Sequence, residues 1–305
     1  MDAQGNPPPP LVVVGAADDD PLARARLLPW FDAPALADST VAVVGLGALG
    51  NEVAKDLLLG GVGTLLLIDP DTVVGANLGR CCLFTPQDAA ARRRKVDAAA
   101  EGLRRLRPAG RPPAGAQLIV LPSTIEQALE DHREQLAKVD LFVGCLDGIG
   151  PRLTLCALAI HRQVPYVDGG IEGLRGRVQV STPRGSTCYE CTLNATHRAV
   201  IEQHYRCGGG AATVVTPAVP AEVSTVAVVA GVCAREVFKL LCKVEETLLS
   251  GVWYYDGWAG TAQTLDLAPS PSCSTHGSGE AGPLTVRGAR PTAEGPSIEV
   301  REGTR

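Results

Sequence analysis

The feature that most constrains this chain is an apolar, β-branched run at residues 41–44 that passes directly into a G-x-G-x-x-G pattern at residues 45–50. A second apolar run, at residues 64–68, ends at Asp69. This order of strand, tight glycine turn, helix, strand and acidic residue predicts a βαβ unit that binds a nucleotide.

The parts of this pattern have separate tasks. Gly45, Gly47 and Gly50 let the backbone approach a phosphate, and the N-terminus of the following helix offers it unpaired N–H groups. The carboxylate of Asp69 accepts a hydrogen bond from a ribose hydroxyl. A tight strand–helix turn without a ligand would need only the glycines, so the position of Asp69 favours a nucleotide site.

Composition narrows the class of protein. A chain of 305 residues with 45% hydrophobic content can bury one large or two modest cores. The net charge of −5 gives no reason to expect a nucleic-acid or membrane partner, and no apolar run reaches the roughly 18 residues of a membrane-spanning helix. The N-terminus has no signal-peptide pattern, so we expect a cytoplasmic, reducing location. The ten cysteines are then expected as metal ligands, reactive thiols or core residues.

Short apolar segments alternate with helical patterns through the first half of the chain. Strands are expected at residues 41–44, 64–68, 117–121 and 141–144, and helices at residues 51–59 and 95–106. The alternation predicts an α/β fold with a Rossmann-like, doubly wound and mostly parallel sheet.

The second half of the chain has a different pattern. Strands are expected at residues 164–168 and 176–182, a buried helix at residues 222–242, and a closing hairpin from residues 253–256 and 264–267. The alternating second strand and the hairpin predict an antiparallel C-terminal extension of the sheet.

Two short pairs of metal-ligand residues lie far apart in the sequence. Cys188 and Cys191 form C-x-x-C, and Cys273 and His276 form C-x-x-H. Four such ligands from two loops match a closed, tetrahedral and therefore structural Zn²⁺ site. The alternatives are a redox pair at Cys188 and Cys191, or a surface position for His276.

Residues 69–80, with the sequence DPDTVVGANLGR, resemble the signature D-x-D-x-V-x-x-x-N-L-x-R-Q of the ubiquitin-activating-enzyme-like adenylyltransferases, the ThiF/MoeB/HesA family. That family includes enzymes that activate sulfur-carrier proteins. The resemblance implies one adenylation domain at residues 21–276, with a nucleotide-binding half at residues 40–150 and a carrier-binding and zinc half at residues 151–276. Composition predicts disordered segments at residues 1–20 and 277–305 on either side.

The resemblance also implies which side chains contact ATP. Asp147 matches an aspartate that holds Mg²⁺, and Arg152 matches an arginine five residues later. Arg24 matches an arginine that reaches the ATP site of the neighbouring subunit, which implies a homodimer. Catalytic roles are expected of Asp147, Lys95, Arg80 and Arg24, because cations and a metal must meet the charge of the transition state. Nucleotide contacts are expected from Gly45, Gly47, Gly50, Asp69, Asp71, Asn77, Arg80 and Lys95.

Some positions depart from the family pattern. Cys81 replaces a glutamine, Gly148 replaces an asparagine, and His276 stands where the fourth zinc ligand is usually a cysteine. The spacing before Lys95 is two residues longer than usual, so Arg93 is an alternative phosphate contact.

Cys207 lies between Arg206 and three glycines, where some family members carry a reactive cysteine. The neighbouring positive charge favours a thiolate, which would take the acyl group from AMP. The alternative is a cysteine without a catalytic task, because several relatives stop at the acyl-adenylate.

The implied function is ATP-dependent and Mg²⁺-dependent adenylation of the C-terminal carboxylate of a small ubiquitin-like or sulfur-carrier protein. A ribosomal peptide in natural-product biosynthesis is an alternative substrate. An NAD-dependent dehydrogenase would share the glycine turn but would leave Asn77, Arg80 and the cysteine pairs unexplained. A non-catalytic adaptor of the same fold is kept open by Cys81 and Gly148.

Overall fold

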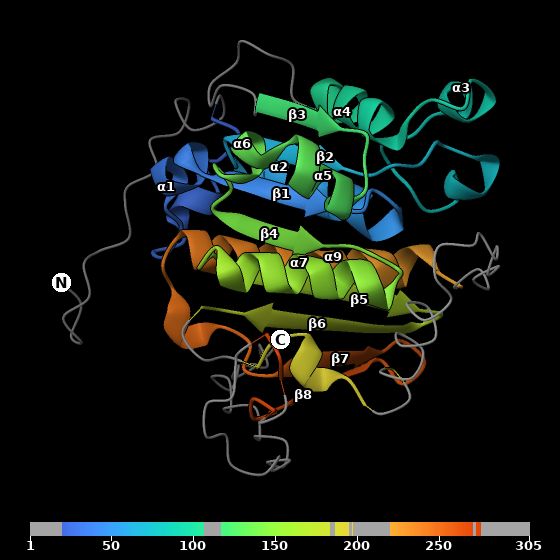
Figure 1. Ribbon diagram of the computed structural model, residues 1–305. Helices are drawn as coiled ribbons and strands as arrows, with labels where there is room; N and C mark the ends of the chain where they lie inside the picture. Colours follow the sequence, from blue (N-terminus) through green and yellow to red (C-terminus); the bar gives the residue numbers. More distant parts are fainter. Residues whose placement is uncertain are drawn as a thin grey trace, which may run out of the picture.

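The computed structural model of the protein describes residues 20–106, 117–183, 187–194, 197, 220–270 and 273–275 (Figure 1). The segments predicted to be disordered, residues 1–20 and 277–305, lie outside these ranges except for Asp20. Across the described ranges, none of the helices has both the length and the apolar character needed to cross a bilayer.

An eight-stranded sheet forms the centre of the fold, in the spatial order β3-β2-β1-β4-β5-β6-β7-β8. Its strands are β1 (Thr40–Val44), β2 (Thr64–Ile68), β3 (Gln117–Leu121), β4 (Leu141–Gly144), β5 (Tyr166–Glu172), β6 (Arg175–Ser181), β7 (Val252–Asp256) and β8 (Thr261–Leu265). The strands from β3 to β5 are parallel, and those from β5 to β8 pair antiparallel. The predicted α/β sheet with an antiparallel C-terminal extension is therefore confirmed.

The parallel strands are apolar on both faces because both faces of the sheet are covered. In β1, Val41 and Val43 belong to one buried cluster, whereas Ala42 and Val44 belong to the other. Successive side chains of a strand point to opposite faces, so one apolar run serves two cores.

The helices form two layers on the sheet. The core on one face includes α2 (Ala48–Gly60), α4 (Lys95–Leu106) and α9 (Val223–Leu241), and the core on the other includes α5 (Ile125–Asp131), α6 (Arg133–Leu136) and α7 (Ile149–His161). In Figure 1, α5, α6 and α7 lie in front of the sheet, and α2 and α9 lie behind it. The short helices α1 (Ala33–Asp38) and α3 (Pro86–Ala90) precede β1 and α4. The doubly wound prediction is confirmed.

Predicted boundaries agree best where apolar runs end sharply. The segments predicted at residues 64–68, 117–121, 141–144 and 95–106 coincide with β2, β3, β4 and α4. The helix predicted at residues 51–59 lies inside α2, and the helix predicted at residues 222–242 exceeds α9 by one residue at each end.

Two predicted strands were misplaced. The strand predicted at residues 164–168 starts two residues later and continues to Glu172, because its second half pairs with β6. The strand predicted at residues 264–267 instead starts at Thr261, since pairing with β7 decides its extent. Its first residues are exposed and give no hydrophobic signal.

The prediction omitted α7. Its 13 residues, IGPRLTLCALAIH, contain few polar residues to mark a helical period. A nearly uniform apolar segment therefore gave no pattern, although it forms one of the main helices over the sheet.

Candidate active site

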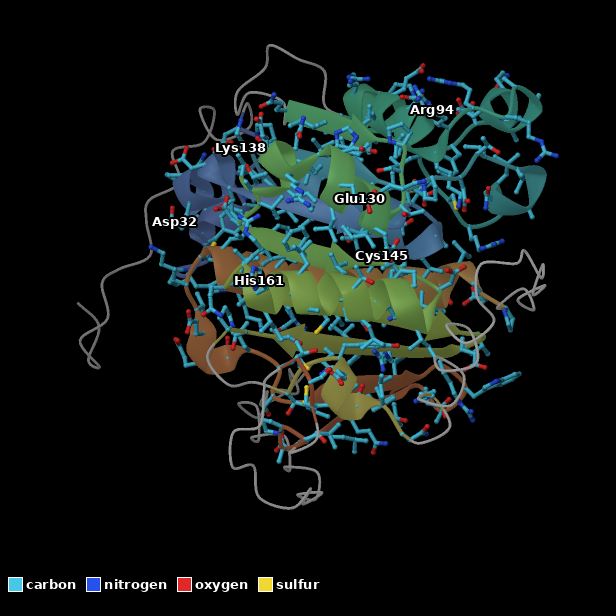
Figure 2. All side chains as sticks on the ribbon, in the orientation of Figure 1. Asp32, Arg94, Glu130, Lys138, Cys145 and His161 are labelled. Carbon is cyan, nitrogen blue, oxygen red and sulfur yellow. The ribbon has the colours of Figure 1, made fainter. Side chains whose placement is uncertain are left out.

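The strand order reverses between β1 and β4, and a cleft opens at the carboxyl ends of these strands. β2 and β3 lie on one side of β1, and β4 and β5 lie on the other. The turns that leave β1 and β4 diverge, so open α/β sheets bind ligands at this point. The cleft has a volume of ≈ 580 Å³. Cys145, labelled in Figure 2, follows β4 directly and lines it.

The glycine turn between β1 and α2 forms one wall of the cleft. Gly45 has φ +91°, and a methyl group there would lie 2.5 Å from the carbonyl oxygen of Cys145. A methyl group on Gly50 would lie 1.8 Å from the carbonyl oxygen of Gly45. A methyl group on Gly47 meets no atom within 4 Å, and Gly47 lines the cleft. Gly45 and Gly50 therefore permit the turn, whereas Gly47 leaves space for a ligand at the N-terminus of α2.

Asp69 holds this turn in place. Its Oδ2 accepts a hydrogen bond of 2.6 Å from the Leu46 N–H, and its Oδ1 accepts one of 2.8 Å from the Asp71 N–H. The carboxylate is buried and lines the cleft. A structural task therefore accompanies the predicted contact with a ribose hydroxyl.

Lys95 begins α4 and points its ammonium group at the same carboxylates. Its Nζ lies 2.7 Å from Asp71 Oδ2 and 3.7 Å from Asp69 Oδ1. Burial alone would lower the pKa of Lys95, but Asp69 and Asp71 raise that pKa above its usual value. The cleft wall therefore carries a permanent cation near neutral pH.

Arg93, the alternative to Lys95, is directed elsewhere. Its Nη1 lies 2.7 Å from Asp88 Oδ1 and 2.8 Å from Glu101 Oε2. Lys95 lines the cleft and Arg93 does not. This placement favours Lys95 as the phosphate contact, a role that stays a prediction.

Asn77 and Arg80 also line the cleft, from the loop after β2. The side-chain oxygen of Asn77 accepts a hydrogen bond of 2.9 Å from the Val74 N–H, which fixes the short helical turn η2 (Gly75–Asn77). Arg80 donates from Nη1 to the carbonyl oxygen of Ala76 at 2.6 Å. Both side chains therefore stand on a locally ordered loop at the cleft.

Asp147 lies in the turn between β4 and α7, and its exposed side chain lines the cleft. Arg152, in the first turns of α7, is buried beneath the same loop. Its Nη2 donates to the carbonyl oxygen of Leu146, and its Nη1 donates to both carboxylate oxygens of Asp168, at 2.9 and 2.7 Å.

Asp168 is a residue that the sequence analysis did not single out. It also accepts hydrogen bonds of 2.7 Å from the Tyr166 hydroxyl and 2.6 Å from Arg177 Nη2. The ring of Tyr189 lies 4.8 Å from the guanidinium carbon of Arg177 and 5.8 Å from that of Arg152. An acidic residue inside an apolar strand was the signal that could have revealed this ion cluster.

The structure brings together three of the four predicted metal ligands. The sulfur of Cys188 lies 3.7 Å from that of Cys191 and 3.5 Å from that of Cys273, and all three residues are buried. These sulfur atoms lie within 4.8 Å of one another, so the group can hold a metal ion. The fourth predicted ligand, His276, lies outside the described residues, as does Cys207.

Glu190 links the loop of Cys188 and Cys191 to the loop of Cys273. It too was not predicted from the sequence. Its carboxylate accepts hydrogen bonds from the backbone N–H groups of Ser274 and Thr275, at 3.1 and 2.9 Å. Their hydroxyl groups donate to it as well. These hydrogen bonds lower the pKa of Glu190 to about 2, although burial opposes the shift.

Arg24 does not lie at the cleft of its own chain. A methyl group on Gly61, directly after α2, would lie 2.9 Å from Leu22 Cδ1, so Leu22 packs at the far end of α2. α2 starts at the cleft and has 13 residues, which separates its ends by about 20 Å. In Figure 2, Asp32 likewise lies at the left edge of the molecule, away from Cys145 near its centre. Action of Arg24 in a neighbouring subunit stays a prediction.

Comparison with known proteins gives consistent matches. The model described as "ThiF family" matches residues 26–275. The molybdopterin-synthase adenylyltransferase of Escherichia coli (strain K12) is 30% identical over 247 residues, which cover 80% of this chain and 89% of that protein. The sulfur carrier protein ThiS adenylyltransferase of the same strain is 30% identical over 251 residues, which cover 82% and 90%.

Solved structures share the fold. Escherichia coli MccB with ATP has a TM-score of 0.67 and 20% identity, covering 86% of this chain and 76% of that chain. The microcin C7 biosynthetic enzyme MccB in complex with N-formylated MccA has a TM-score of 0.67 and 19% identity, covering 87% and 77%.

Replacing single glycines should separate folding from ligand binding. We expect Gly50→Ala to lower the free energy of unfolding by about 1–3 kcal/mol, because its methyl group meets backbone. Gly47→Ala should change it by less than about 0.5 kcal/mol and weaken ATP binding at least tenfold, because its methyl group occupies the ligand's space. Urea unfolding and titration calorimetry measure the two effects. Equal ATP affinity of Gly47→Ala and the unchanged protein would contradict this assignment.

Proposed function

The chain belongs to the ThiF family, and from this premise we propose that it adenylates the C-terminal carboxylate of a small ubiquitin-like or sulfur-carrier protein. A carboxylate oxygen attacks the α-phosphorus of ATP, the bond from that phosphorus to the bridging oxygen breaks, and pyrophosphate leaves with the electron pair. The product is an acyl-adenylate. The cleft at the strand-order reversal carries this proposal, because it gathers the N-terminus of α2, cationic side chains that include Lys95 and Arg80, and the carboxylate of Asp147.

The chain's own residues supply most of what this reaction needs. The backbone at Gly47 and the N-terminus of α2 accept a phosphate, and Lys95 and Arg80 offset the negative charge that develops on it. Asp147 fits a Mg²⁺ ligand, because its exposed carboxylate lines the cleft and Mg²⁺ prefers carboxylate and phosphate oxygens. Bound there, the ion would neutralise charge on the phosphates.

The identity of the substrate divides into two candidates. Relatives named for molybdopterin synthase and for ThiS support a carrier protein. The MccB structures determined with MccA support a peptide as the alternative, through a fold likeness alone. Family membership removes the reason for an NAD-dependent dehydrogenase. If the cleft binds no ATP, the chain is instead a non-catalytic adaptor of the same fold.

Three further proposals concern the parts around the cleft. We assign Zn²⁺ to the cysteine cluster, with His276 as its fourth ligand and a structural role. We assign Arg24 to the cleft of a second copy in a homodimer, since its own cleft is too distant. Cys207 keeps its two alternatives, an acyl acceptor or a residue without a catalytic task.

The organisation of the chain remains part of the proposal. We retain one adenylation domain at residues 21–276, with a nucleotide-binding half at residues 40–150 and a carrier-binding and zinc half at residues 151–276. A cytoplasmic location fits the reduced cysteines that a zinc site requires.

Adenylation is tested by exchange of labelled pyrophosphate into ATP. In the presence of Mg²⁺, either a carrier protein ending in Gly-Gly or a ribosomal peptide should support exchange. Asp147→Ala should lower the exchange rate at least ~100-fold, the scale for loss of a group that stabilises the transition state. Asp131→Ala removes an exposed carboxylate outside the cleft and serves as the control. Unchanged exchange in Asp147→Ala would exclude the role given to Asp147.

The homodimer is tested by mixing two inactive variants. Arg24→Ala and Asp147→Ala should each lose exchange, because each removes a group needed at every cleft. A mixed dimer keeps one cleft with both groups, so mixing should restore up to about a quarter of the unchanged activity under random subunit exchange. If labelled subunits exchange and activity does not return, Arg24 does not act across the interface.

The zinc site is tested by elemental analysis and thermal unfolding. The protein should contain about one zinc per chain, and chelation should lower the melting temperature, because metal binding to the native state is linked to folding. His276→Ala should lose zinc more readily than the unchanged protein. A variant truncated after Gly277 is the matched control, and it should keep its zinc. Full zinc retention by His276→Ala under chelator would remove this histidine from the ligand set.

A further inference from the structure

A buried arginine ties the Asp147 turn to the sheet beneath it. Arg152 donates from Nη2 to the carbonyl oxygen of Leu146, the residue directly before Asp147. From Nη1 it donates to both oxygens of Asp168 in β5. The guanidinium group is planar and rigid, so the position of the Leu146 carbonyl follows the position of Arg152.

The charges around Asp168 do not balance. Two arginines, the buried Arg152 and the partly exposed Arg177, share this single carboxylate, and the Tyr166 hydroxyl donates to it as well. The ring of Tyr189 lies against both guanidinium groups. An aromatic face attracts a cation, and the attraction is stronger away from water. Tyr189 therefore stabilises the excess positive charge of the two arginines.

The loop that carries Cys188 and Cys191, here called the cysteine loop, restrains the Tyr189 ring through the residues on both sides of it in the chain. Tyr189 stands between the buried ligand residues Cys188 and Cys191, and it is itself 5% exposed. The next residue, Glu190, is hydrogen-bonded to the second cysteine loop at Ser274 and Thr275. A ring attached to two such anchors has little freedom to move away from the arginines.

We propose that Tyr189 is a positioning residue through which the cysteine loop orients the Asp147 turn, by the contacts Tyr189 to Arg152 and Arg152 to the Leu146 carbonyl. The proposal rests on the proposed function, because it concerns the turn to which Mg²⁺ is assigned. It gives the metal-ligand loop a second task besides folding, namely control of the geometry of a metal contact at the cleft.

The expected defect follows from these contacts. Without the ring, the two like-charged guanidinium groups lose a stabilising partner, and Arg152 no longer has one fixed position. The Leu146 carbonyl and the Asp147 carboxylate then sample several positions. Binding of ATP alone should persist, whereas the gain in ATP affinity that Mg²⁺ provides should fall.

The experiment compares Tyr189→Leu with Tyr189→Phe by titration calorimetry of ATP, with Mg²⁺ and without added Mg²⁺. We expect Tyr189→Leu to lose about tenfold or more of the Mg²⁺-dependent gain in affinity, the scale for residues that orient a metal ligand. Tyr189→Phe keeps the aromatic face and should keep the gain. Both variants should bind ATP without Mg²⁺ as the unchanged protein does, and elemental analysis should show unchanged metal content.

Other outcomes overturn the proposal. A full Mg²⁺-dependent gain in Tyr189→Leu would show that the ring does not position the turn, and an equal loss in both variants would show that the aromatic face is not what matters. If Tyr189→Leu does not fold, Arg152→Lys replaces it, because a lysine can pair with Asp168 but cannot bridge to Leu146 as a planar fork. A full gain in Arg152→Lys would also contradict the proposal.

The result for the unchanged protein separates this proposal from the proposed function. If the unchanged protein shows no Mg²⁺-dependent binding of ATP, the proposed function fails and the positioning role fails with it. If it binds Mg²⁺ and ATP but the variants do not differ from it, only the positioning role fails.

Discussion

The close approach of two backbone turns is the constraint on which the cleft depends. The turn after β1 contacts the segment after β4 at Gly45 and Cys145, at a distance that admits no side chain on Gly45. Because the two turns touch at their base, the loops that continue from them separate beyond that point. The open volume, the free N-terminus of α2 and the position of the Asp147 turn all follow from this contact.

Charge is distributed unequally around the cleft. On the β2 side, two carboxylates, Asp69 and Asp71, surround the single ammonium group of Lys95. On the β5 side, two guanidinium groups surround the single carboxylate of Asp168. Each side contains a buried charge, Asp69 on the first and Arg152 on the second, and a buried charge costs stability unless further groups compensate it. The compensation comes from backbone N–H groups on the first side, and from an aromatic ring on the second.

Local patterns predicted the part of the fold in which one element decides its own limits. The apolar run of β2 and the glycine turn before α2 were read correctly because the bounding residues mark their ends. The start of β8 at Thr261 was not predicted, because pairing with β7 fixes it. Helix α7 was not predicted, because its residues are nearly all apolar and show no helical period. The pairing of one strand with another leaves no periodic pattern in a single sequence.

The same distinction applies to the site. Residues of the glycine turn and of the loop after β2 could be proposed from their order, and the structure has Gly45, Gly47 and the loop residues Asn77 and Arg80 lining one cleft. Asp168 and Glu190 were not proposed, because two of the partners that give them their roles, Arg152 and Ser274, are 16 and 84 positions away in the chain. Arg93 and Lys95 look equivalent in the sequence, and only the carboxylates that each one faces distinguish them.

The hydrogen bonds of Glu190 have a consequence for the connectivity of the chain. They join two positions that are 84 residues apart and so close a long loop that contains α9, β7 and β8. Closing such a loop in an unfolded chain is entropically unfavourable, but the cost falls once the intervening elements have packed and brought the ends together. The hydrogen bonds of Glu190 therefore favour an order of folding in which the sheet is complete before the loop of Glu190 meets the loop of Ser274. In the native protein the same hydrogen bonds restrain the C-terminal edge of the sheet, because β8 cannot move far from the sheet without separating Ser274 from Glu190.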